Sequence, residues 1–218
     1  GARLRIIKLK KFKFLVICKY KNFYKALEDA RILIKSDSVA IELLDDNILS
    51  AMRKSKYRND LKYFHIAKSD KIEAVNIVEY HFSTQLEMQK KIDGIKGEMR
   101  VIGSLCSSFD IVTGLEGMAH VWRLRSLAVG ISASLEKKAV PFIEDVAVSI
   151  TDLPAYCKEL RLLLDSYKLR YFIYGHVDVG CLHVRPLMDL KDVSQVELMR
   201  EILLKNLNLV KKYSGVMW

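Results

Sequence analysis

Proline and glycine are scarce in this sequence, which has 3 prolines and 10 glycines among 218 residues. Such a composition favours long regular elements over a loop-rich scaffold. No apolar run approaches the roughly 20 residues of a membrane-spanning helix. Lysines interrupt the apolar residues throughout positions 1–20, which does not indicate a signal peptide. The 4 cysteines form no C-x-x-C pair, so we expect reduced thiols and a cytoplasmic protein.

Charge is plentiful in this chain but dispersed along it. Half of the residues are hydrophobic and 28% are charged, which excludes a disordered chain. The net charge is +10, yet lysine and arginine occur in scattered pairs and never in a run of five. A nucleic-acid interface gathers such charges on one face between aromatic side chains, so we expect no nucleic-acid partner. The basic excess is more typical of a solvated surface, or of a face that meets an anionic substrate or an acidic domain.

The hydrophobic patterns predict two similar halves. The expected strands cover 11–19, 39–44, 72–82, 140–150, 170–176 and 181–187. The expected helices cover 22–35, a short stretch from Asp45, 84–97, 115–135, 151–167 and 192–213. Mixed helices and strands with an antiparallel hairpin predict an α+β fold. We expect duplicated ferredoxin-like units, with a largely antiparallel sheet and helices packed on one face.

The same patterns predict how the chain is divided. We expect the first ferredoxin-like half over 1–102, a connecting helical segment over 103–138, and a second half with a histidine hairpin over 139–218. The sequence does not begin with methionine and ends in the apolar run Val216–Trp218. We therefore expect one domain that is a fragment of a larger protein.

The hairpin between positions 174 and 183 contains two histidines. If its turn is centred on Asp178 and Val179, residue 176 lies opposite Cys181, and His183 points to the same face as His176. Their Cα atoms would then lie about 7–8 Å apart as a diagonal cross-strand pair. Two imidazoles at that offset can bind one metal ion, which makes both histidines candidate ligands. The alternative is that both rings fill space and hydrogen-bond to the backbone.

Other candidate site residues surround this hairpin. Arg185 shares the histidine face, and Arg125 lies on the helix over 115–135, so either guanidinium could bind a small carboxylate through two parallel hydrogen bonds. Either Glu144 or Asp145 could orient an imidazole or a cofactor edge, and adjacent strand residues face opposite ways, so only one of them can do so. Cys181 is a ligand or nucleophile by position, although a buried structural thiol is the simpler interpretation.

Three motifs in this order resemble the C-terminal domain of the FAD-linked oxidases, a family that includes D-lactate, glycolate and D-2-hydroxyglutarate dehydrogenases. Trp122–Arg125 resembles the family's LW-x-x-R, Phe142–Ser149 its EDVAVP, and Tyr174–His183 its GHxGDGNLH. The resemblance covers nearly the whole chain. Two departures stand out, since Asp178–Cys181 replaces GDGN and Ser149 replaces the proline of EDVAVP.

The resemblance implies a cap domain that covers a separate FAD-binding domain of the same polypeptide and forms the substrate side of an oxidoreductase active site. A hydride would pass from the substrate Cα to the flavin, and this fragment alone would be inactive. His176 and His183 would bind a divalent metal such as zinc or manganese. The third ligand would be a glutamate beyond Trp218. Arg125 would bind the substrate carboxylate and Arg185 would line the same pocket. From its position beside the hairpin, independently of the resemblance, we expect Glu144 to contact the cofactor.

Several points stay open at this stage. The resemblance allows an iron–sulfur cluster elsewhere in the full-length protein and an electron acceptor at the periphery of the inner membrane. It assigns no catalytic base, no oligomeric state and no particular 2-hydroxy acid. The competing interpretation is a ferredoxin-like module without chemistry, which binds RNA or another partner through exposed aromatic residues on its sheet.

Overall fold

The computed structural model describes residues 8–55, 58–66, 70–135, 139–143 and 145–217. The strands found there are β1 (Phe12–Tyr20), β2 (Ala40–Asp45), β3 (Ala74–Phe82), β4 (Ser108–Val112), β5 (Ala139–Pro141), β6 (Asp145–Ala147), β7 (Tyr171–His176), β8 (Cys181–Asp189) and β9 (Val216–Met217). The α-helices are α1 (Phe23–Leu33), α2 (Asp46–Lys54), α3 (Gln85–Ile102), α4 (Leu115–Leu135), α5 (Leu153–Ser166) and α6 (Val193–Lys212). Short 3₁₀ helices are η1 (Ile34–Ser36), η2 (Arg58–Phe64) and η3 (Val177–Val179).

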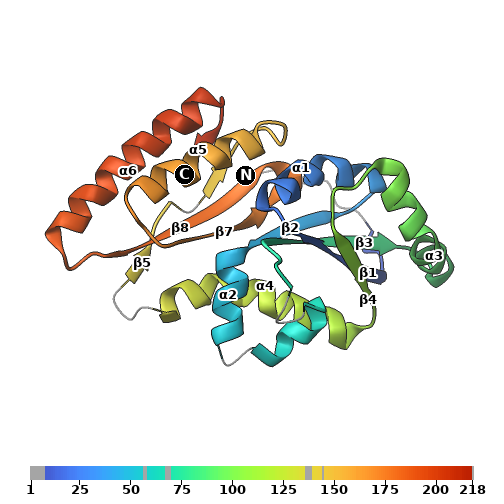
Figure 1. The fold of residues 1–218 in the computed structure, drawn as a ribbon. Helices are drawn as coiled ribbons and strands as arrows, with labels where there is room; N and C mark the ends of the chain where they lie inside the picture. Colours follow the sequence, from blue (N-terminus) through green and yellow to red (C-terminus); the bar gives the residue numbers. More distant parts are fainter. Residues whose placement is uncertain (1–7, 56–57, 67–69, 136–138, 144, 218) are drawn as a thin grey trace.

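The strands form one antiparallel sheet in the order β4-β1-β3-β2-β7-β8-β6-β9, with β5 paired to β8 (Figure 1). The first four of these strands, with α1 and α3, make one β-α-β-β-α-β unit. The last four, with α5 and α6, make a second unit with the same internal order. The predicted α+β fold of duplicated ferredoxin-like units is therefore confirmed. The two units join where β2 pairs with β7, with Glu42 opposite His176 and Leu44 opposite Tyr174.

Helices cover both faces of the sheet. The four helices of the two repeats, α1, α3, α5 and α6, pack on one face, as predicted (Figure 1). The additional helices α2 and α4 pack on the opposite face, where the prediction placed none. The reason is visible in β1, where Phe14 and Val16 face the first core, Leu15 and Ile17 face the second, and all four have 0% exposure. A strand that is apolar on both sides needs cover on both sides.

This double cover bears on the RNA-binding alternative. A ferredoxin-like RNA-binding module stacks bases on aromatic side chains of an open sheet face. Here the sheet aromatics Phe14 and Tyr80 are buried against the helices of the first core. The structure therefore offers that alternative no support.

Three segments differ in detail from the sequence prediction. The expected strand over 140–150 is divided into β5 and β6, and η2 lies in a segment for which the prediction gave neither a helix nor a strand. The stretch over 103–117, expected without a strand, contains β4, an edge strand whose serine and aspartate give it little hydrophobic signal. The predicted division of the chain at 102 and 138 stays a prediction. None of the described helices is both long enough and apolar enough to cross a bilayer.

A buried aspartate ties the two repeats together beside their joint. Asp45 accepts hydrogen bonds from the backbone of Ile48, at 2.9 Å, and of Ile173 in the second repeat, at 2.8 Å. The Arg161 guanidinium lies 3.6 Å from the same carboxylate and stacks over the ring of Phe23. Burial raises the pKa of Asp45 from 3.8 to about 7, and the arginine only partly opposes this rise.

We predict that this group makes the stability of the fold fall as the pH rises from about 4 to about 7, because the folded chain holds a proton there that the unfolded chain has lost. Asp45→Asn keeps the N-cap oxygen but removes the titration. We expect the free energy of unfolding of the variant minus that of the wild type, measured in urea, to increase across this pH range. Above the range this difference should be constant. Asp192→Asn, at the exposed N-cap of α6, should show no such gain. The prediction would be contradicted if Asp45→Asn and the wild type differed in free energy of unfolding by the same amount throughout this pH range.

Gly175 lets the histidine hairpin close tightly. A Cβ atom there would lie 2.3 Å from the carbonyl oxygen of Cys181 and 2.8 Å from the Cα of Leu182. Both atoms belong to the backbone of the facing strand, so neither can move without displacing β8. Any larger residue at this position would push the two strands apart.

We therefore predict that Gly175→Ala destabilises the fold by about 2–3 kcal/mol, since the added methyl group overlaps main-chain atoms. Gly94→Ala is the matched control, because Gly94 lies inside α3 with nothing within 4 Å of its Cβ position. It should stabilise the fold by about 0.5–1 kcal/mol through helix propensity. Chemical denaturation measures both changes, and equal effects of the two substitutions would be the contrary outcome.

Candidate functional site

The candidate site lies at the joint between the repeats, on the face of the sheet that carries α4. Tyr174 pairs with His183 across the β7–β8 hairpin, which is the register predicted from the turn. Gly180 closes that turn with a φ of 71°. His176 and His183 consequently lie on one face as a diagonal pair, and their Nε2 atoms are 3.4 Å apart.

A carboxylate holds each imidazole by its other nitrogen. Glu42 Oε1 lies 2.5 Å from His176 Nδ1, and Asp145 Oδ1 lies 2.5 Å from His183 Nδ1. The sheet sets both contacts, because Glu42 is paired with His176 between β2 and β7, and Asp145 with His183 between β6 and β8. An ionised carboxylate only accepts hydrogen bonds, so both Nδ1 atoms carry the proton. The lone pairs of both Nε2 atoms are then left to face one another.

Two facing lone pairs repel unless a proton or a cation lies between them. Two nitrogens that each lie about 2.0–2.1 Å from one tetrahedral ion are themselves about 3.4 Å apart. The Nε2 atoms have this separation, and a carboxylate on Nδ1 is the usual outer partner of a metal-binding histidine. The residues present therefore fit a divalent metal ion as two of its ligands.

The environment keeps His183 in the form that binds metal. Burial lowers the pKa of His183 below 6.5, and the hydrogen bond to Asp145 only partly offsets this effect. The imidazole is therefore neutral near pH 7. The His176 side chain is 43% exposed and that of His183 is 17% exposed, so the pair is open on one side.

Two arginines lie beside the histidine pair. Arg125, from α4, places Nε at 2.9 Å and Nη2 at 2.8 Å from Glu42 Oε2. Its guanidinium lies 5.2 Å from the centre of the Tyr174 ring, and that of Arg185 lies 5.6 Å from the same ring. The structure thus brings both predicted arginines to the histidines, around one buried tyrosine.

Glu42 is the residue of this site that the sequence analysis did not identify. Its carboxylate joins Arg125 to His176, and the residue is only 7% exposed. A signal was present, since a single glutamate interrupts the apolar run of β2. Of the two acidic candidates near the hairpin, Asp145 contacts an imidazole, while Glu144 lies outside the described residues.

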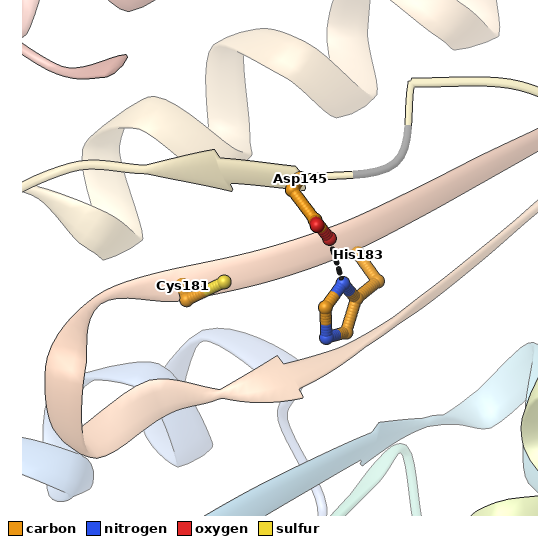
Figure 2. A group of neighbouring side chains, drawn as sticks. All are labelled: Asp145, Cys181 and His183. Atoms are coloured by element: carbon orange, nitrogen blue, oxygen red, sulfur yellow. Dashed lines mark hydrogen bonds and ion pairs between the residues drawn. The ribbon is translucent and has the colours of Figure 1, made fainter. Parts of the chain in front are cut away.

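Cys181 lies next to this arrangement. Figure 2 shows it on the same strand as His183, with Asp145 reaching across from β6. One donor atom from each of the three residues lies within 4.8 Å of the others. Burial raises the pKa of the Cys181 thiol, which matches the interpretation as a buried structural thiol. Asp145 already accepts from His183 Nδ1, so the Nε2 pair is the better candidate for a metal.

The remaining histidines lie outside the site. His65 contacts Asp110 at 3.1 Å, and His81 contacts Glu79 at 2.8 Å. His120, although close in sequence to Arg125, stacks on Tyr63. None of the three shares a contact with the histidine pair among the described residues.

Comparisons with known proteins identify relatives of this chain. A family model described as "FAD linked oxidases, C-terminal domain" matches residues 9–218. Curated relatives named D-2-hydroxyglutarate dehydrogenase come from Pseudomonas putida, 31% identical over 221 residues, and Escherichia coli K12, 31% identical over 224 residues. All of this chain is matched in both, and it spans 22% of the length of each.

Solved structures share the fold. One is 4-ethylphenol oxidase from Gulosibacter chungangensis, with a TM-score of 0.68 and 9% identity, covering 97% of this chain and 46% of that one. Another is p-cresol methylhydroxylase, with a TM-score of 0.67 and 11% identity, covering 95% of this chain and 45% of that one. At such identities the likeness concerns the fold alone.

Proposed function

The chain belongs to the family of FAD-linked oxidase C-terminal domains, and we propose that it forms the substrate side of the active site of an FAD-dependent 2-hydroxy-acid dehydrogenase. The observation that carries the proposal is the His176–His183 pair, whose Nε2 atoms converge at 3.4 Å beside two arginines. Relatives named D-2-hydroxyglutarate dehydrogenase favour D-2-hydroxyglutarate over D-lactate or glycolate as the substrate.

His176 and His183 would hold a divalent metal ion through Nε2. Such an ion polarises a hydroxyl or carboxylate oxygen that binds to it and lowers the pKa of the hydroxyl. Glu42 and Asp145 keep the Nδ1 protons in place, so the imidazoles cannot rotate or change tautomer. Zinc and manganese both accept imidazole ligands, and the donor set so far does not select between them.

A further ligand of the metal ion belongs to our proposal. The family resemblance puts a glutamate ligand beyond Trp218. The strand β9 pairs with β6, the strand that carries Asp145.

The charges around the pair favour an anionic substrate. Glu42 and Asp145 carry two negative charges that Arg125 and Arg185 cancel, and His183 is neutral near pH 7. A divalent ion would add two positive charges to this half-buried site, and the proposed glutamate ligand would cancel one of them. The carboxylate of a 2-hydroxy acid would neutralise the other, so the choice of D-2-hydroxyglutarate in our proposal depends on the named relatives.

In our proposal a bound flavin would supply the acceptor for the hydride from the substrate Cα. Its own binding site belongs in our proposal to the part of the enzyme outside this chain, because the sequence has no glycine-rich phosphate loop. The open side of the histidine pair is where that part would meet this domain. An iron–sulfur cluster and the electron acceptor would likewise belong to the rest of the enzyme.

The test is anaerobic flavin reduction in the intact enzyme. We expect D-2-hydroxyglutarate to bleach the flavin with a kcat/KM about 100-fold or more above that of D-lactate, since a site that binds a second carboxylate keeps an unpaired polar partner when the smaller acid binds. His183→Ala should abolish metal-dependent turnover, because one of the two ligands described here is lost. A preference for D-lactate, or unchanged kinetics in His183→Ala, would overturn the proposal.

We also predict that Glu42→Gln weakens Zn²⁺ binding by about 10–100-fold, because the outer partner of a ligating histidine sets its tautomer and basicity. Glu79→Gln is the matched control, since Glu79 also contacts a histidine at 2.8 Å on the same sheet, away from the site. Competition with a chelating dye measures both affinities in the intact protein. Equal affinities for the two variants would show that Glu42 does not support a metal ligand.

A further inference from the structure

Two of the cysteines lie against each other in the first repeat, away from the histidine pair. Cys18 is in the middle of β1 and has 0% exposure, and Cys106 is half-buried in the connection between α3 and β4. A hydrogen bond joins their side chains. The other two cysteines, Cys157 and Cys181, are in the second repeat.

The sheet holds the segment of Cys106 beside the strand of Cys18. Cys18 is paired with Phe109 of β4, and the backbone N–H of Ser107 donates to the carbonyl of Lys19 at 2.8 Å. Cys106 directly precedes Ser107 and packs against the same hydrophobic core as Cys18. Its own N–H donates to Ser104 Oγ at 3.4 Å, which fixes the connection from the other side.

The two thiols have different chemical roles open to them. The hydrogen bond from Cys18 lowers the pKa of Cys106 to about 7, whereas that bond and burial raise the pKa of Cys18 well above its ordinary value. Cys106 also lines a cavity of about 500 Å³ whose other lining residues include Lys96 and Arg100. A small oxidant or an anionic disulfide such as glutathione disulfide can therefore approach the more acidic of the two thiols.

We propose that Cys18 and Cys106 form a reversible disulfide, with Cys106 as the attacking thiolate and Cys18 as the resolving thiol. With hydrogen peroxide, the Cys106 sulfur attacks one oxygen and the O–O bond breaks. The departing hydroxide takes up a proton to give water, and Cys106 becomes a sulfenic acid. The Cys18 sulfur then attacks the Cys106 sulfur, and the second hydroxide leaves with the Cys18 proton as water. Two thiols are oxidised to one disulfide, and one peroxide is reduced to two waters.

The bond would join a central strand to the segment that precedes an edge strand. It would close a chain loop from 18 to 106, and constraining a long loop stabilises the fold against unfolding. β4 pairs with β1 and with no other strand described in the structure, so it would gain most from the link. Oxidation would therefore raise the melting temperature of the protein, and dithiothreitol would reverse the increase.

The experiment treats the intact protein with hydrogen peroxide, blocks the remaining thiols by alkylation and maps peptides by mass spectrometry. We expect a Cys18–Cys106 peptide pair that dithiothreitol separates. Cys18→Ala should instead accumulate a Cys106 sulfenic acid that dimedone traps. Cys106→Ala should leave Cys18 reduced, and Cys157→Ala, as a control in the other repeat, should form the bond as the wild type does. The proposal would be overturned if Cys106 of the wild type could still be alkylated after oxidation. It would also be overturned if Cys18 became oxidised in Cys106→Ala.

A second measurement needs no variant. In the reduced wild type at neutral pH, iodoacetamide should modify Cys106 at least about 10-fold faster than Cys157, because burial raises the pKa of the Cys157 thiol to about 12. Equal rates at the two cysteines would contradict the assignment of Cys106 as the attacking thiolate. These readouts involve neither metal nor hydroxy acid, so their outcome is separate from that of the dehydrogenase assignment.

Discussion

The antiparallel pairing of β2 with β7 is the contact on which the site depends. In a single ferredoxin-like unit each of these strands would be an edge, with unpaired N–H and C=O groups. Pairing the two edges satisfies both and makes one continuous sheet from two repeats. The same register puts Glu42 of the first repeat opposite His176 of the second. The polar centre therefore exists only because the repeats are joined in this register, and neither repeat contains it alone.

Burying Glu42 at this joint imposes a further requirement. A carboxylate that is 7% exposed is costly unless hydrogen bonds and opposite charge compensate it. His176 supplies one bond from β7, and Arg125 supplies a charged fork from α4. Because α4 is the long connection between the repeats, this ion pair also holds that helix on the sheet. The Glu42 carboxylate thus has three effects. It holds α4 over the second core, links the two repeats and orients the His176 imidazole.

The parts of the structure that could be predicted from the sequence depend on local chemistry. Asn22 caps α1 and Thr84 forms a capping box with Glu87, because those bonds span two or three residues. The histidine pair could also be predicted from the sequence, since a tight turn fixes the register of its hairpin. The partnership of Glu42 with His176 was not, because it joins positions 134 residues apart through a strand pairing that no local pattern encodes. The cover by α2 and α4 was missed although the apolar run Phe14–Ile17 of β1 is typical of a strand that is buried on both faces.

Cys181 shows how such a site tolerates a changed motif. The position of His183 is set by the pairing of β8 with β6 and β7, and the side chain two residues earlier does not enter those backbone bonds. The family resemblance puts an asparagine where Cys181 stands, and a carboxamide could donate a hydrogen bond to Asp145. A buried thiol is a much weaker donor, so it leaves the Asp145 carboxylate to His183 Nδ1. The change therefore alters what surrounds the pair while the convergence of its Nε2 atoms, which the proposed chemistry requires, is retained.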